Sequence, residues 1–95
     1  MNAKNSPIAC FRLGRIDSTP NALNHLSDED ILSGLQRRQA GDWGELDEED
    51  RGANQRPLDF GGRLLSVYHS TTGVKFYIIT EPDRRLTTIL LPEDY

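Results

Sequence analysis

The chain has 95 residues, a hydrophobic fraction of 36% and a formal net charge of −4 at pH 7. This length allows one domain and excludes a second independent core. The single cysteine, Cys10, excludes an intrachain disulfide framework and cannot form a zinc site alone. Neither a leader pattern nor an apolar run near the ~20 residues of a membrane span occurs. We therefore expect a cytoplasmic protein with no metal, no cofactor and no membrane partner.

Charge is distributed unevenly along the chain. Between Asp28 and Asp50 there are nine acidic residues against Arg37 and Arg38, a balance of −7, whereas the remaining residues have a balance of +3. An acidic block of this size accelerates association with cationic surfaces. It therefore predicts a basic protein surface as a partner.

The N-terminal third predicts a short strand. Residues 1–7 are polar and predict a disordered N-terminal end, which precedes a single α+β domain over residues 8–95. Residues 8–16 alternate loosely around Phe11 and Leu13, which is typical of a strand.

Three helices are expected next. Ser18 or Thr19 can cap a short helix or turn over residues 20–26. Ser27 precedes three acidic residues, so it predicts the start of a second helix over residues 28–40. A third helix is expected from about Glu48 to residue 54 or 55, ending before a pair of glycines.

The C-terminal third predicts three strands, over residues 63–69, 74–80 and 86–91. Their connections are too short for a parallel crossover, so the three strands should form an antiparallel meander. Both faces of the middle strand are largely apolar, so helices should cover one face and the N-terminal strand or a partner chain the other. The expected fold class is α+β, with two or three helices on an antiparallel sheet of three or four strands. A homodimer is plausible on the same grounds.

The C-terminal strands carry more polar side chains than a small sheet needs. The candidate catalytic residues are Arg63, Ser66, Tyr68, His69, Glu81, Arg84 and Thr88. In a compact nuclease resembling the barnase/RelE-like group, arginines would stabilise the charge on phosphorus, and His69 or Glu81 would move the 2′-hydroxyl proton. Cross-strand pairing and solvated edge charges explain the same residues without a reaction.

A second candidate surface lies in the acidic block. Its predicted partner-binding residues are Asp42, Trp43, Glu45, Glu48, Glu49 and Asp50. Trp43 lies in a Gly-Asp-Trp-Gly sequence and is either an aromatic anchor for a partner or a plug that closes the core.

Nucleic acid and small nucleotides are further possible ligands. Arg84 and Arg85, with Arg63 and Lys75 on adjacent strands, can form a phosphate-binding patch beside tyrosines of the same sheet, Tyr68 and Tyr77. The negative net charge argues against this interpretation.

Several motifs resemble a group of small bacterial proteins of unknown function that are borne on plasmids and integrated elements. The matching motifs are GDWG at 41–44, GRxxSxY at 62–68, IITExDR at 78–84 and TTxLLPxxY at 87–95. Some members of the group are labelled as type I restriction subunits, which a chain this short does not support. The resemblance implies carriage on a mobile element. Members of that group commonly have a histidine at the position of Arg38. This chain has arginine there, which argues against an essential histidine base at that position.

Taken together, the sequence predicts a small mobile-element-associated binding or regulatory protein that acts through protein or nucleic-acid interaction. The alternatives are a compact barnase/RelE-like ribonuclease or toxin and a binder of a small nucleotide.

Overall fold

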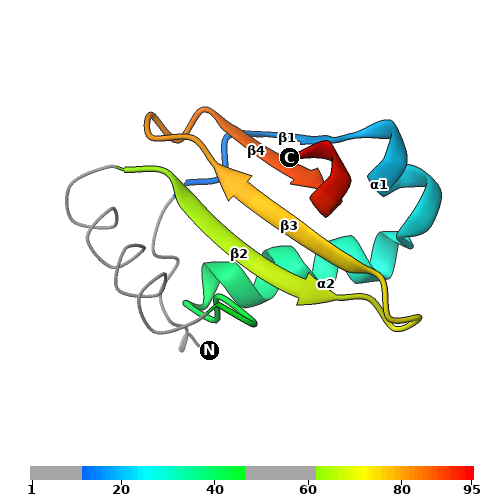
Figure 1. Ribbon diagram of the computed structural model, residues 1–95. Coiled ribbons are helices and arrows are strands. Elements are labelled where there is room, and N and C mark those ends of the chain that lie inside the picture. The colour runs from blue at the N-terminus through cyan, green and yellow to red at the C-terminus, as the bar shows by residue number, and fades with distance from the viewer. Residues whose placement is uncertain (1–11, 47–61) are drawn as a thin grey trace.

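The computed structural model describes residues 12–46 and 62–95. They form two helices, a four-stranded mixed sheet and a short 3-10 turn, which confirms the α+β class (Figure 1). In chain order the elements are β1 (Arg15–Ser18), α1 (Pro20–His25), α2 (Asp28–Gln39), β2 (Leu64–His69), β3 (Lys75–Thr80), β4 (Leu86–Leu90) and η1 (Pro92–Asp94). The expected third helix and the N-terminal end lie outside the described residues.

The strand order in the sheet is β1-β4-β3-β2. Strands β2, β3 and β4 form the expected antiparallel meander. The expectation of an antiparallel sheet is wrong for β1, which pairs in parallel with β4, with Arg15 opposite Leu86 and Ser18 opposite Ile89. A parallel neighbour needs a long crossover, and here the chain supplies it through both helices and two strands before β4 begins.

Strand β1 also differs from its predicted position. It occupies Arg15–Ser18, whereas the sequence pattern placed a strand over residues 8–16, of which residues 8–11 lie outside the described part of the chain. It extends the edge of the sheet and does not cover one face as expected. Its backbone continues the ladder at both ends, because Arg15 N donates to Arg85 O at 2.9 Å and Thr19 N donates to Ile89 O at 3.0 Å.

Both helices begin at the residues that their capping signals indicate. Thr19 Oγ1 accepts a hydrogen bond from Ala22 N at 3.1 Å, and Pro20 takes the first turn of α1, where it needs no donor. Ser27 and Asp30 form a reciprocal capping box at the start of α2. Asp30 Oδ1 also accepts from Thr71 N at 3.1 Å, so the start of α2 is tied to the β2–β3 turn.

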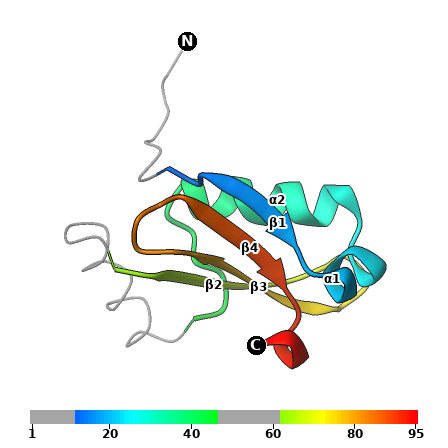
Figure 2. The same ribbon diagram turned by 90° about the horizontal axis from the view of Figure 1, so that it is seen from above.

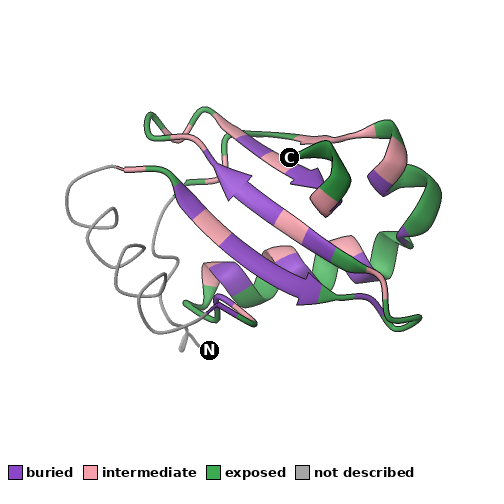
Figure 3. Cartoon of the chain, in the orientation of Figure 1, coloured by how far each residue is buried: buried purple, intermediate pink, exposed green. Residues whose placement is uncertain are grey.

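Helix α2 covers one face of the sheet, and η1 lies on the opposite side (Figures 1 and 2). The core between helices and sheet contains Ala22, Leu26, Tyr68, Phe76, Ile78, Ile89 and Leu91. A Cβ on Gly34 would lie 3.0 Å from the Ile78 side chain, so glycine lets α2 approach β3 closely. A second buried cluster contains Trp43, Leu46, Leu64 and Val67. Figure 3 shows the buried positions concentrated along β2, β3 and β4. In the part of the chain that the structure describes, no helix could cross a membrane.

Candidate functional site

The most unusual side chain in the core is that of Arg38, which is fully buried between α2 and the sheet. Its Nη1 donates to Ser66 Oγ and, at 2.6 Å, to Ile78 O; its Nη2 donates to Thr80 Oγ1 at 2.8 Å. Burial lowers the pKa of Arg38 to about 10. Arg38 is therefore still charged at pH 7, and neutral acceptors from two strands solvate its charge.

The hydroxyl groups around Arg38 continue as a chain of hydrogen bonds. The hydroxyls of Thr80 and Thr87 are 2.8 Å apart, and Thr87 Oγ1 donates to Leu13 O at 2.6 Å. Ser66, Thr80 and Thr87 are all fully buried. These strand hydroxyls thus solvate a buried cation and connect it to the backbone of the segment before β1.

Sequence reasoning missed this role for Arg38 because arginine in the last turn of a helix is explained equally well by the helix dipole. One signal was present. Asp30, Gly34 and Arg38 recur every four residues, and all three are buried on the same face of α2.

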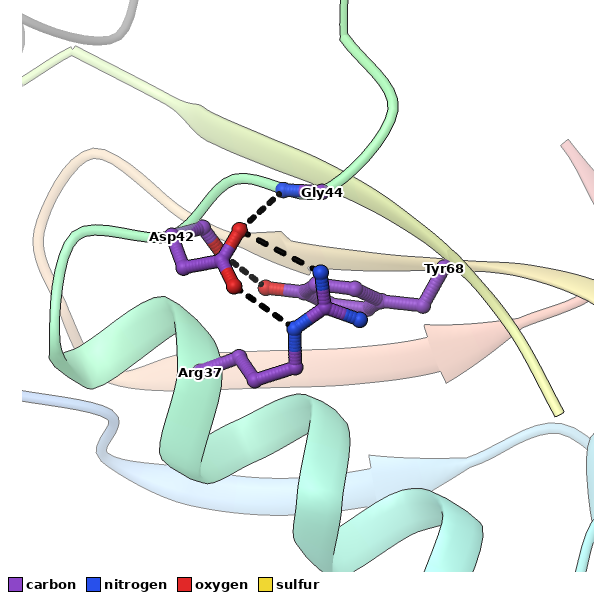
Figure 4. A network of polar contacts seen from close by, with 4 residues as sticks. All are labelled: Arg37, Asp42, Gly44 and Tyr68. Atoms are coloured by element: carbon purple, nitrogen blue, oxygen red, sulfur yellow. Dashed lines mark hydrogen bonds and ion pairs between the residues drawn. The ribbon is translucent and has the colours of Figure 1, made fainter. Parts of the chain in front are cut away.

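The loop after α2 is held by a second network, shown in Figure 4. Arg37 Nε lies 2.7 Å from Asp42 Oδ2, and the Arg37 guanidinium carbon lies 4.7 Å from the centre of the Tyr68 ring. Tyr68 Oη donates to Asp42 O at 2.7 Å, and Asp42 Oδ1 accepts from Gly44 N at 3.0 Å. Asp42 and Tyr68, both candidate site residues, therefore shape the Gly-Asp-Trp-Gly loop.

Trp43 belongs to the core of this loop and does not project as an anchor. It is 6% exposed and packs with the second buried cluster. Val67 N donates to Trp43 O at 3.1 Å and Glu45 N donates to Val67 O at 2.9 Å, so the loop pairs with the edge of β2. Gly44 has φ of +75°, and a Cβ there would lie 1.9 Å from Val67 O. These contacts favour the core-plug interpretation of Trp43.

Glu45 and His69 form a contact at the end of β2. His69 Nδ1 lies 2.5 Å from Glu45 Oε2, and both side chains are about half exposed. Beside them is a cleft of about 430 Å³ between α2 and the β2–β3 turn, lined by Arg37 and Ser70 among others. The other predicted partner-binding residues, Glu48, Glu49 and Asp50, lie outside the described residues.

The seven candidate catalytic residues do not converge. Ser66 and Tyr68 point towards α2, whereas His69 lies at the far end of β2. Thr88 pairs with Ile79, on the face opposite to Thr87. Arg63 Nη2 donates to Tyr95 Oη at 2.7 Å on that same face.

Glu81 and Arg84 flank the β3–β4 turn at the end of the sheet away from His69. Arg84 Nη1 donates to Gly62 O at 2.6 Å and to Glu81 O at 3.1 Å. Its backbone φ of 61° is unusual for a non-glycine residue. These bonds make Arg84 a clamp between the β3–β4 turn and the start of β2.

An arginine-rich groove of about 1060 Å³ opens at the end of the sheet where β1 begins. Its charged and amide lining residues are Arg12, Arg15, Arg84, Arg85, Asp83 and Gln39. We call this the arginine groove. Sequence reasoning grouped Arg84 and Arg85 with Arg63 and Lys75, and it missed Arg12 and Arg15 because it did not foresee the parallel pairing.

Close backbone contact holds the two sides of the arginine groove together. Gly14 has φ of +68°, and a Cβ there would lie 2.3 Å from the backbone carbon of Arg85. Only glycine allows the segment before β1 to approach the start of β4 this closely. Arg12 and Arg15 are thereby fixed beside Arg84 and Arg85.

Comparison of the chain with protein families, curated proteins and solved structures gives no significant match. Among residues 12–46 and 62–95, no three histidine, cysteine or carboxylate side chains are placed to hold a metal ion.

Proposed function

We propose that the protein is a non-enzymatic binding protein that holds the phosphate backbone of nucleic acid in the arginine groove. The observation that carries this proposal is the parallel pairing of β1 with β4, which places Arg12 and Arg15 beside Arg84 and Arg85. Guanidinium groups present a planar fork of donors that matches phosphate oxygens in pairs. Several guanidinium groups along one open groove can bind successive phosphates of a ligand that carries many.

Arg12, Arg15 and Arg85 are exposed and available to an incoming anion, whereas Arg84 is held by backbone carbonyls. The Arg15 side chain is 76% exposed and that of Arg85 is 87% exposed. Each has a nearby carboxylate, Asp17 at 2.7 Å and Asp83 at 4.0 Å. Exposed pairs of this kind contribute about 0–1 kcal/mol, so a phosphate can compete with them.

The net charge of −4 does not describe this end of the molecule. Asp42 and Glu45 are paired with Arg37 and His69 within the fold. Asp30 is buried in the capping box at the opposite end of α2. The local charge of the groove therefore favours an anion, although the whole chain is acidic.

The dispersal of the candidate catalytic residues supports binding over catalysis. A ribonuclease needs a proton acceptor, a proton donor and a group that stabilises charge around one phosphate. His69 is at one end of β2, and the buried Ser66 is occupied by Arg38. A binding role also suits the mobile-element setting that the sequence motifs suggest, which remains part of the proposal.

The test is fluorescence anisotropy with a labelled 20-base-pair duplex at several salt concentrations. Three phosphate contacts, from Arg12, Arg15 and Arg85, predict an affinity about 40-fold weaker at 200 mM than at 50 mM salt. Arg85→Gln should reduce that ratio to about tenfold. Asn24→Asp is the control, because it changes net charge equally on α1, away from the groove.

Three results would contradict the proposal. The first is the absence of salt-dependent binding, and the second is binding that Arg85→Gln leaves unchanged. The third is stronger capture of an acidic peptide than of the duplex, which would assign the groove to a protein partner.

A further inference from the structure

Two tyrosines and two cations form a continuous series on the sheet face opposite α2. Arg63 Nη2 donates to Tyr95 Oη at 2.7 Å, and its guanidinium carbon lies 5.7 Å from the centre of that ring. Tyr95 meets Tyr77 edge to face with ring centres 5.7 Å apart, and Lys75 Nζ lies 5.9 Å from the Tyr77 ring centre. We call Arg63, Tyr95, Tyr77 and Lys75 the tyrosine ladder.

In the part of the chain that the structure describes, the tyrosine ladder is open to a ligand. Tyr95 is 64% exposed, which is unusual for a large aromatic side chain, and Tyr77 is half-buried. A hollow of about 320 Å³ lies against both rings, and its apolar wall includes Leu65 and Val67. Cation–π contacts at exposed sites contribute only about 0.5–1 kcal/mol, so stability alone is a weak reason for this arrangement.

Its chemistry matches an unstacked nucleobase. Aromatic side chains on an open sheet face stack on the π-face of any base, and flanking cations contact the adjoining phosphates. The hydrogen bond from Arg63 holds the Tyr95 ring and reduces the entropy lost when a base stacks on it. Bases of a duplex are already stacked on each other, so this face distinguishes single strands from duplexes.

The tyrosine ladder begins at the same end of the sheet as the arginine groove. Arg63 directly follows Gly62, whose carbonyl accepts the 2.6 Å hydrogen bond from Arg84. A strand whose phosphates lie in the groove can therefore continue over the start of β2 onto the tyrosines.

We propose that the tyrosine ladder stacks one or two bases of a single-stranded nucleic acid while the arginine groove holds the adjoining phosphates. This inference rests on the proposed function and adds the preference for single strands. It also revises the sequence grouping, because Tyr68 faces α2 and Tyr95 takes its place beside Tyr77.

The experiment compares binding of a labelled 12-nucleotide single strand and a duplex of the same sequence by anisotropy. The unmodified chain should bind the single strand more tightly. Tyr95→Leu should weaken single-strand binding by roughly 5- to 150-fold, as the loss of one stacked base predicts, and leave duplex binding within twofold. Tyr95→Phe keeps the ring and should retain most of the single-strand affinity.

The outcomes separate this inference from the proposed function. The chain could bind both ligands equally, with no effect of Tyr95→Leu and weaker binding of both ligands by Arg85→Gln. That result overturns the proposed role of the tyrosine ladder and leaves the proposed role of the arginine groove in place. Absence of binding to either ligand overturns both. Because Tyr95 is exposed, Tyr95→Leu should fold, which a thermal melt verifies; Tyr77→Leu is the second variant and should show the same selective loss.

Discussion

Replacing Arg38 with methionine tests whether the strand hydroxyls are turned inward to hold a buried cation. Methionine fills much of the same volume and supplies no donor. Ser66 Oγ, Thr80 Oγ1 and Ile78 O would each lose a hydrogen bond from the guanidinium. Arg37→Met is the matched control, because Arg37 precedes Arg38 on the same helix and its side chain is 45% exposed.

The size of the effect follows from two opposing terms. Each acceptor left unsatisfied in the core costs about 1–3 kcal/mol. Four acceptors lose the guanidinium, Leu64 O at 3.4 Å included, although Thr80 Oγ1 keeps its contact with Thr87. Removing the charge also removes its desolvation penalty, which offsets part of that cost. We expect Arg38→Met to lower the free energy of unfolding by about 3 kcal/mol. Arg37→Met should lower it by no more than about 1 kcal/mol, as for other exposed ion pairs.

Urea unfolding measures both values. With a denaturant slope of about 1–3 kcal/mol per molar, the Arg38→Met midpoint should fall by about 1–3 M. The triple variant Arg38→Met, Ser66→Ala, Thr80→Val removes the donor together with its two hydroxyl acceptors and leaves the backbone carbonyls in place. It should recover part of the loss, because the two hydroxyls are no longer left without the guanidinium. A loss below about 1 kcal/mol for Arg38→Met would refute the stabilising role of the Arg38 hydrogen bonds. A loss in the triple variant equal to the sum of the losses in the three single variants would refute it too.

The remaining predictions concern the loop after α2 and the two helix starts. Gly44→Ala should cost about 3 kcal/mol or more in urea unfolding, because its Cβ would overlap a carbonyl oxygen of β2. Gly41→Ala, with φ of +84° and open space around it, should cost only about 1 kcal/mol, and equal losses would contradict the overlap. The backbone amide of Thr71, and then that of Ser27, lower the pKa of Asp30 from its ordinary value. Its stabilising contribution is therefore present above the pKa of the unfolded chain, about 4, and is lost as pH falls further. Asp30→Asn should therefore make the free energy of unfolding less dependent on pH below about pH 4. An unchanged pH dependence in that range would count against the capping box. Thr19→Ala should lower the melting temperature by several degrees through loss of a cap worth about 1 kcal/mol. Hydrogen exchange should show loosening of α1 and of η1, because Thr19 Oγ1 also donates to Asp94 at 2.7 Å.

The features predicted correctly from sequence are those set by local chemistry. Thr19 with Pro20, and Ser27 with Asp30, start the helices through hydrogen bonds to residues within one turn. The meander follows from two short connections that leave no alternative to antiparallel pairing. Such signals require no knowledge of distant parts of the chain.

The features that were missed depend on distant parts of the chain. The pairing of Arg15 with Leu86 joins segments separated by most of the sequence, and no local pattern selects a parallel partner. The buried role of Arg38 needs acceptors from two strands. Tyr68 and Tyr77 were grouped by their place on neighbouring strands, yet they point to opposite faces because Tyr68 pairs with Phe76 and not with Tyr77.

One measurement tests the functional account most directly: titration of the ¹⁵N-labelled chain with a short single-stranded oligonucleotide, followed by amide chemical shifts. We predict shifts at Arg15 and Arg85 in the arginine groove and at Tyr77 in the tyrosine ladder. Amides at the start of α2, on the other face of the sheet, should stay unchanged. Shifts confined to the cleft beside His69, or to the acidic start of α2, would contradict the account, as would the absence of any shift.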